Sequence, residues 1–264
     1  MSAGVFIPHD LTFVPWLDAL TGAALGPGEN AVADLVLELA QVGREHGLTL
    51  EVCHDLGLYA QLHAADPRLS FSPSVNPAYN PATSPADTAI MVLRRGQVVV
   101  GVYGMGVRWI SGTLRERIDD MTVICQRPDL LPPGDSWHCT ADIADAIANC
   151  TVGLGMSIWT DQTAGAHERV ISALLSRMMI LYFYMQACAG WFVGFATKVV
   201  ARSLTFGTYG AEGMQDGVTF THAGRTVPTL FVYAARARYR RQLMRSTFLD
   251  LSMPLSALPP ERAA

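Results

Sequence analysis

Residues 151 to 209 decide the fold, and they read TVGLGMSIWTDQTAGAHERVISALLSRMMILYFYMQACAGWFVGFATKVVARSLTFGTY. The block runs as an apolar strand, a polar turn that contains glycine, a long apolar helix, a second apolar strand and a second helix. A strand that enters a helix through such a turn leaves free backbone N–H groups at the N-terminus of the helix. Helix N-termini attract anions, phosphate groups above all. The pattern therefore predicts an α/β protein that holds an anionic ligand at this turn.

The composition predicts a chain with a packed core. Of the 264 residues, half are apolar and 16% are charged, which allows one large domain or two small lobes and is too apolar for disorder. We predict a mainly helical N-terminal segment over 1–65 that packs on the main domain, and a proline-rich loop or linker over 66–87. The main domain then covers 88–245, and a tail covers 246–264. Proline disfavours helix in the loop. The loop contains Pro67, Pro73, Pro77, Pro81 and Pro85.

Several further elements are expected outside the opening block. A hairpin is the clearest, with strands over 88–93 and 98–109 joined by the turn Arg94-Arg95-Gly96-Gln97. Three glycines in its second strand predict bulges or close backbone approach. They are Gly101, Gly104 and Gly106. The other expected elements are a strand over 48–53, a helix capped by Asp55, a short helix or loop over 114–120, an irregular strand over 121–126, a short helix over 142–149, and strands over 216–221 and 228–235.

Charge and cysteine content exclude several classes of protein. The net charge is −4 and the pI is about 5.9, so we expect no nucleic-acid partner. The five cysteines are odd in number and form no C-x-x-C pair, which favours a reduced cytoplasmic protein with buried thiols. The seven histidines have no metal-ligand spacing, so we expect no metal. The N-terminal sequence MSAGVFIPHDLTF does not resemble a signal peptide.

One apolar segment, between Arg177 and Lys198, has Gln186 as its only strongly polar residue. About twenty apolar residues can span a bilayer. However, Gly190 and Gly194 interrupt the segment, and WFVGF is typical of a strand. We therefore interpret the segment as a buried helix followed by a central strand, and a membrane-associated protein is the less favoured alternative.

The order of elements over residues 86 to 240 resembles the GNAT superfamily of acyltransferases. RRGQVVVGVYGM at 94–105 resembles the central hairpin of that fold, and SIWTDQTAGAHERVISALLSRM at 157–178 is similar to its strand, turn and helix for acetyl-CoA. TFGTYGAE at 205–212 resembles the segment that closes its fourth helix. The resemblance implies a central mixed, mostly antiparallel sheet flanked by helices, here with an N-terminal helical extension. It also implies acetyl-CoA or another acyl-CoA as co-substrate.

The resemblance assigns the acyl-CoA contacts to the strand and turn after residue 157. The implied contact residues are Ile158, Trp159, Thr160, Gln162, Thr163, Ala164, Gly165, Ala166 and His167. The family signature Gln/Arg-x-x-Gly-x-Gly/Ala falls on 162–167, and its first four positions fit. His167 replaces the small last residue, where it would either crowd the phosphates or add a cationic donor.

The implied reaction is the direct attack of a small-molecule amine, or another small nucleophile, on the thioester. Many family members protonate the departing thiolate with a tyrosine, but Phe206 stands at that position and cannot donate a proton. Tyr209 is the nearby candidate for this role. Glu116 is the candidate general base. The alternative bases are Asp119, Asp120 and Asp142.

The departures at His167 and Phe206 keep a second function open, a GNAT-like binding or assembly protein with altered catalysis. In the enzyme hypothesis acyl-CoA lies between splayed strands near 156–160 and 191–195. The acceptor then enters from the side of the N-terminal helices and the proline-rich loop. We expect no membrane partner. The arginine-rich run over 236–245 is typical of a solvated helix face or the rim of a homodimer, and a patch that binds phosphate or an acidic partner is the less favoured alternative.

Overall fold

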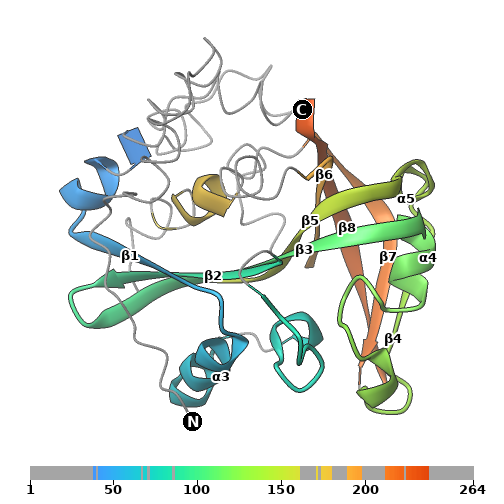
Figure 1. Cartoon of the computed structure of the whole chain (residues 1–264), viewed down its shortest axis with the longest axis horizontal. Coiled ribbons are helices and arrows are strands. Elements are labelled where there is room, and N and C mark those ends of the chain that lie inside the picture. Colours follow the sequence, from blue (N-terminus) through green and yellow to red (C-terminus); the bar gives the residue numbers. More distant parts are fainter. Residues whose placement is uncertain are drawn as a thin grey trace.

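A single mixed sheet organises the part of the chain that the computed structural model describes, which is residues 38–39, 41–66, 68–69, 72–84, 87–160, 171, 174–179, 189–197, 212–222 and 224–237. Its eight strands follow the order β1-β2-β3-β5-β6-β8-β7-β4 (Figure 1). All neighbouring strands are antiparallel except β5 and β6, which are parallel. The strands are β1 (Leu48–Cys53), β2 (Thr88–Arg95), β3 (Val98–Thr113), β4 (Ser136–Cys139), β5 (Ala148–Thr160), β6 (Trp191–Thr197), β7 (Gly213–His222) and β8 (Arg225–Ala235). The predicted fold class, a mixed and mostly antiparallel sheet flanked by helices, is confirmed.

The predicted hairpin is formed by β2 and β3. Gly96 adopts φ +59°, the left-handed conformation that a two-residue hairpin turn needs and that glycine adopts without strain. The strands are longer than expected because pairing continues to Arg95↔Val98 on the turn side and β3 runs on to pair with β5. The first six residues of β2 are all buried, so this strand has packed neighbours on both faces.

Short helices connect the strands, and local capping explains the starts of α3 and α4. In α3 (Leu56–Ala65), the Asp55 side chain accepts a hydrogen bond of 2.8 Å from the Gly57 N–H, as predicted. α4 (Leu114–Asp119) begins with a capping box in which Thr113 and Glu116 bond to each other's backbone N–H. The remaining short elements are η1 (Pro73–Val75), η2 (Pro128–Leu130) and α5 (Ile143–Ala146).

Glycines in β3 show what covers each face of the sheet. A Cβ at Gly101 would lie 2.7 Å from Leu175 Cδ1, so the helical residues 174–179 press on this face. A Cβ at Gly104 would lie 2.8 Å from Val75 Cγ1, so η1 presses on the opposite face. Figure 1 shows α3 below the sheet and the ochre helix near residue 175 above it. The predicted close approach at these glycines is confirmed.

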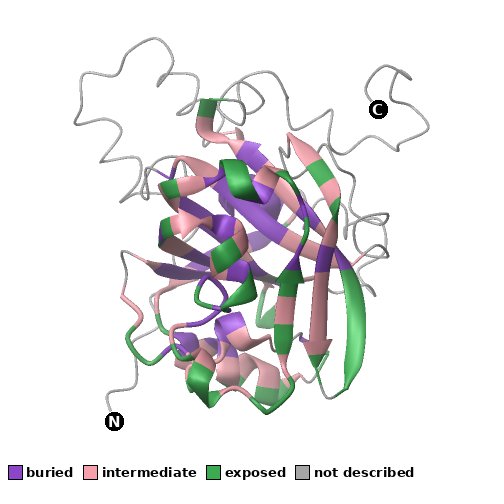
Figure 2. Ribbon diagram, turned by 90° about the vertical axis from the view of Figure 1, so that its right-hand side faces the viewer, coloured by how far each residue is buried: buried purple, intermediate pink, exposed green. Residues whose placement is uncertain are grey.

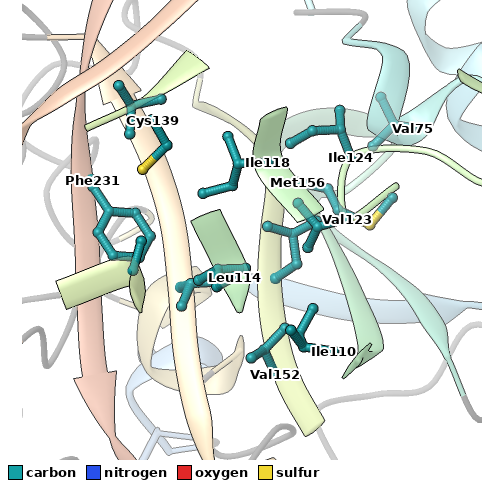
Figure 3. Packing of buried hydrophobic residues seen from close by; sticks show 14 of the residues in the cluster. Val75, Ile110, Leu114, Ile118, Val123, Ile124, Cys139, Val152, Met156 and Phe231 are labelled. Atoms are coloured by element: carbon teal, nitrogen blue, oxygen red, sulfur yellow. The ribbon is translucent and has the colours of Figure 1, made fainter. Parts of the chain in front are cut away.

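The main hydrophobic cluster lies on the face that η1, α3 and α4 cover. Leu56 and Tyr59 of α3, Val75 of η1 and Leu114 and Ile118 of α4 pack there against apolar side chains of the sheet. Figure 3 shows part of this cluster, and Figure 2 shows that the buried residues concentrate along the middle of the sheet.

The irregular strand expected over residues 121–126 is wrong, because this segment forms turns. The Asp120 carboxylate accepts hydrogen bonds from the Thr122 N–H and hydroxyl at 3.0 and 2.5 Å, and Met121 takes φ +64°. The Ile124 and Cys125 N–H groups then both donate to the Met121 carbonyl. This turn buries Val123, Ile124 and Cys125 in the core, where apolar content alone had suggested a strand.

Among the described residues, none of the helices has the length and apolar character needed to cross a membrane. The middle of the apolar segment discussed above, residues 180–188, lies outside the described ranges.

Candidate functional site

The two parallel strands separate at one point in the sheet. β5 and β6 pair from Val152↔Trp191 to Gly155↔Gly194. Beyond Gly155, β5 continues to Thr160 on β3, and beyond Gly194, β6 continues to Thr197 on β8. The sheet therefore has an opening between the two strands after the glycine pair. The predicted separation is confirmed for β5, whereas on β6 it begins after Gly194 instead of at Trp191.

A bulge in β5 lies at the start of this opening. Gly104 pairs with Ser157 and Met105 pairs with Gly155, so Met156 falls between the two pairs. A bulge bends its strand and increases the local twist. The bend at Met156 therefore accompanies the departure of β5 from β6.

The proline-rich loop packs against the bulge and is part of the packed structure, not a separate linker. The Ser72 and Ser74 hydroxyls donate to the Met156 carbonyl at 3.2 and 3.1 Å. The Asn80 amide, which is 1% exposed, donates to the carbonyls of Pro73, Ser74 and Asn76. These bonds satisfy buried main-chain groups and fix the loop as a wall beside the opening.

A cavity of about 540 Å³ lies where the opening, the loop and strands β4 and β7 meet. This volume falls in the range of roughly 300–1,000 Å³ that is typical of small-molecule sites. The opening contributes Leu154, Gly155, Met156, Phe195, Ala196 and Thr197. The loop contributes Ser72, Pro73, Ser74, Asn76 and Tyr79, and β4, β7 and their flanking turns contribute Pro132, Asp135, Trp137, Phe220 and His222. Ile124 and Thr229 complete the lining.

A histidine and a carboxylate lie against each other in this lining. The antiparallel pairing of β4 with β7 joins Ser136↔Thr221, so the next residues outward, Asp135 and His222, also face each other. His222 Nδ1 is 2.8 Å from Asp135 Oδ2. The Asp135 side chain is 1% exposed and the His222 side chain is 58% exposed. The carboxylate is thus buried behind an imidazole that reaches solvent.

Aromatic side chains continue the same face of these strands. Side chains two residues apart on a strand share a face. Trp137 therefore lies on the same face as Asp135, and Phe220 lies on the same face as His222. The Trp137 and Phe220 rings stack at 4.9 Å, and Phe195 of β6 lies 4.7 Å from Trp137. The Trp137 Nε1 donor is buried and has no hydrogen-bond acceptor among the described residues. Buried donors are normally satisfied, so a water or ligand oxygen is expected there.

The charges in the cavity are few. Among the described lining residues, Asp135 is the only carboxylate and none is lysine or arginine. In the same part of the chain, no group of three or more histidine, cysteine or acidic residues could hold a metal ion. The described part of the lining is therefore mainly apolar, and it contains the hydrogen-bonded pair of Asp135 and His222.

The cysteines near this region are not activated nucleophiles. Cys125 and Cys139 are buried, as predicted for the thiols, whereas Cys53 and Cys150 are half-buried. Burial raises the pKa of Cys125 to about 11 and also raises the pKa of Cys139. Because the thiolate is the reactive form, both side chains stay protonated and unreactive at neutral pH.

Only part of the predicted acyl-CoA site lies within the described residues. Ile158, Trp159 and Thr160 form the end of β5 and pair with Tyr103, Val102 and Gly101. The Trp159 ring lies 5.7 Å from the Arg68 guanidinium. The turn over 162–167 is outside the described residues, and so are Phe206 and Tyr209.

The predicted general bases lie on α4 and α5 and are not among the cavity-lining residues. Glu116 is exposed, and its Oε2 accepts the Thr113 N–H at 2.9 Å. Asp119 accepts the Cys139 N–H at 2.8 Å, Asp120 pairs with Arg117 at 2.7 Å, and Asp142 precedes α5 without a side-chain capping bond. The catalytic assignment of Glu116 stays a prediction.

The sequence did not indicate Asp135 and His222 as partners. Asp135 follows a Pro-Gly turn signal, and His222 directly follows the expected strand over 216–221. The available signal in the sequence was the spacing Asp135-x-Trp137 and Phe220-x-His222. This spacing places one ionisable and one aromatic side chain on the same face of each strand. Only the pairing of β4 with β7 brings these two pairs together.

A comparison with protein-family models finds no match, and a comparison with curated protein sequences finds none either. Among solved structures, the fold is similar to FeeM, an N-acyl amino acid synthase from uncultured soil microbes, with a TM-score of 0.36 and 12% identity over 83% of this chain and 91% of that one. It is also similar to an aminoglycoside N(6')-acetyltransferase from Legionella pneumophila, with a TM-score of 0.39 and 6% identity over 74% of this chain and 96% of that one. At TM-scores this low, neither likeness carries an inference about this chain's chemistry.

Proposed function

We propose that this protein transfers an acyl group from an acyl-CoA thioester to a small amine. The observation that carries the proposal is the opening between β5 and β6 beyond Gly155 and Gly194, which leads into a cavity with an ionisable pair. An opening inside a sheet leaves main-chain N–H groups without strand partners, and such N–H groups can donate hydrogen bonds to a carbonyl oxygen. A thioester placed there would meet a nucleophile that enters from the cavity.

The resemblance of residues 86–240 to the GNAT superfamily supports the same chemistry. The hairpin β2–β3 and the strands β5, β6, β7 and β8 occur in the order on which the resemblance rests. The end of β5, with Ile158, Trp159 and Thr160, lies beside the opening, where the resemblance implies acyl-CoA contacts. The proposal extends to the turn over 162–167 as the pyrophosphate site.

The proposed reaction needs no covalent enzyme intermediate. The amine nitrogen attacks the thioester carbonyl carbon, the C–S bond breaks, and coenzyme A leaves as its thiolate. The amine loses one proton and the thiolate gains one, so the products are an amide and free coenzyme A. Tyr209 stays the candidate for the proton that the thiolate gains.

Two measurements on the full-length protein test this function. We expect acetyl-CoA or longer acyl-CoAs to raise the Tm, because a ligand that binds the folded state stabilises it. Adding a panel of amines should then produce amide and free coenzyme A, measured by mass spectrometry. If acyl-CoA binds but no amine is acylated, the alternative of a binding or assembly protein is favoured. If no acyl-CoA shifts the Tm at saturating concentration, the proposal is wrong.

A variant at the opening gives the test a structural control. Ala196 lies on β6 beyond the last β5–β6 pair and lines the cavity. The Ala196→Leu substitution should narrow the opening and weaken acyl-CoA binding. Ala146 lies exposed in α5, so Ala146→Leu adds the same atoms away from the opening and should leave binding unchanged.

A further inference from the structure

We propose that the cavity is the acceptor site, that it selects amines with a flat apolar body and no anionic group, and that His222, in place of Glu116, is the general base that takes the proton of the amine. Asp135 is the positioning residue for His222. This inference rests on the proposed acyl transfer and adds the substrate class and the base. It follows from the hydrogen bond between the two side chains, the aromatic wall beside them and the scarcity of charge among the described lining residues.

The hydrogen bond to Asp135 orients the imidazole for proton transfer. An ionised carboxylate can only accept, so the contact of 2.8 Å requires the proton of a neutral imidazole to be on Nδ1. The lone pair is then on Nε2, the atom that can accept a proton from a substrate. Within the described ranges, no group hydrogen-bonds to Nε2. The buried carboxylate also stabilises the imidazolium that forms when the proton arrives.

The imidazole has a second fixed contact. Its ring stacks on Phe220 with an interplanar angle of 11° and a centroid distance of 5.8 Å. A side chain that is 58% exposed would otherwise have several rotamers of similar energy. The carboxylate and the phenyl ring together favour the observed orientation of His222 beside the cavity.

The wall next to His222 determines what kind of amine fits. Phe220 and Trp137 stack on each other, and Phe195 lies against Trp137 from the β6 side of the opening. Aromatic side chains in a cavity wall pack well against flat apolar groups, in offset or edge-to-face arrangements, and a ring face that reaches the cavity attracts a cation in preference to an anion. With no lysine or arginine among the described lining residues, a carboxylate or phosphate on the acceptor would lose its hydration without gaining a partner there.

The proton path follows from this placement. The nitrogen of the neutral amine forms its bond to the thioester carbonyl carbon, and His222 Nε2 removes a proton from that nitrogen. The C–S bond then breaks, and the electron pair leaves with the thiolate of coenzyme A. The imidazolium returns its proton to solvent or to the thiolate, so the enzyme is restored and charge is balanced.

A matched pair of acceptors tests the substrate class. 2-Phenylethylamine and phenylalanine differ by one carboxylate, and propylamine lacks the aromatic ring. With saturating acetyl-CoA, kcat/KM for 2-phenylethylamine should exceed that for phenylalanine and for propylamine by at least about tenfold. Loss of one polar or apolar contact in an enzyme site commonly lowers kcat/KM by this factor or more. Equal or greater kcat/KM for phenylalanine would overturn the predicted substrate class.

A second histidine–aspartate pair, between β4 and α4, provides the control for the base. His138 of β4 is 66% exposed and lies 3.3 Å from Asp119, but it is on the other face of β4 from Trp137 and does not line the cavity. The His222→Gln variant should lose about 100-fold or more in kcat, as is typical for removal of a general base. His138→Gln should keep the kcat of the unchanged protein. Equal losses in the two variants, or no loss in His222→Gln, would contradict the assignment of the base.

Further readouts separate catalysis from folding. Added imidazole should restore part of the kcat of His222→Ala, because the site is solvent-exposed, and a purely structural role would not respond. Asp135→Asn should lower kcat while KM for the amine stays unchanged. Acyl-CoA binding should be intact in all these variants. If the unchanged protein does not bind acyl-CoA, the proposed function itself is wrong. If it binds acyl-CoA and acylates amines, but the rate does not depend on His222, only this inference is wrong.

Discussion

The Ser74 hydroxyl donates a hydrogen bond of 3.1 Å to the Met156 carbonyl, at the bulge where β5 separates from β6. Ser72 donates to the same oxygen at 3.2 Å. The loop and the opening are therefore one structural unit, because the carbonyl at the bulge depends on loop hydroxyls for its hydrogen bonds.

Removing these hydroxyls should destabilise the protein. Ser72→Ala with Ser74→Ala leaves the Met156 carbonyl without both donors and should lower the free energy of unfolding by about 1–3 kcal/mol. Either single variant should cost less, since the other hydroxyl still donates. Ser136 is exposed on β4 and serves as a control, for which we expect a change within about 0.5 kcal/mol. Urea denaturation compares the four variants with the unchanged protein. A double variant as stable as Ser136→Ala would contradict the claim that the loop and the opening depend on each other.

A methyl group at Gly101 should destabilise the contact between β3 and the helical residues 174–179. The new Cβ would lie 2.7 Å from Leu175 Cδ1 and 2.8 Å from Ile171 Cγ2, so both side chains must move. Overpacking of this kind costs about 1–3 kcal/mol. The control is Gly194→Ala, whose Cβ would be 3.8 Å from Phe192 Cζ, an ordinary contact. Thermal unfolding should give a lower Tm for Gly101→Ala than for the control.

Two aspartates at helix starts should differ in their contribution to stability. The Asp55 side chain caps α3, whereas Asp142 precedes α5 and makes no capping bond. Asp55→Ala should lower the free energy of unfolding by about 1 kcal/mol, because the Gly57 N–H loses its acceptor. Asp142→Ala should be close to neutral. Equal losses in urea denaturation would show that capping does not explain the start of α3.

Alkaline pH should destabilise the protein partly through Cys125. Burial raises the pKa of this thiol from 9.0 to about 11, so between these values the unfolded chain releases the proton while the folded chain keeps it. The free energy of unfolding must then fall as pH rises above about 9, by at most about 1.4 kcal/mol per pH unit for one thiol. The Cys125→Ala variant should show a shallower fall.

The pH range of that measurement matters because Arg177 acts in the opposite direction. Burial lowers the pKa of Arg177 to about 10, so above this value the folded protein loses a proton before the unfolded chain does, and stability rises. The comparison of Cys125→Ala with the unchanged protein is therefore made between pH 9 and 10. Parallel curves over this interval would contradict the raised pKa.

Local patterns predicted much of this fold. The hairpin β2–β3, the cap at Asp55 and the strand WFVGF each depend on residues close together in the sequence, and each is present. The segment over 121–126 was mistaken for a strand because its apolar residues face the core from turns, which hydropathy alone does not distinguish. Over 121–126 the sequence predicted burial correctly, but the bonds from the Thr122 N–H and hydroxyl to Asp120 help to fix this segment as a turn.

The site depended on contacts that the sequence could not specify. Asp135 and His222 are 87 residues apart and meet because β4 joins the sheet edge next to β7. Long-range strand pairing has no local signature, so neither residue could be ranked above the acidic residues of α4. The separation of β5 and β6 was expected from the family resemblance, and its position at Gly155 and Gly194 came from the observed register.

A crystal structure of the full-length protein with a non-hydrolysable acyl-CoA analogue would locate the acyl-CoA site directly. We predict that the acyl carbonyl lies in the opening between β5 and β6, beside Met156, with its open side toward the cavity and His222. An analogue bound at another surface of the protein, or crystals that contain none at saturating concentration, would contradict it.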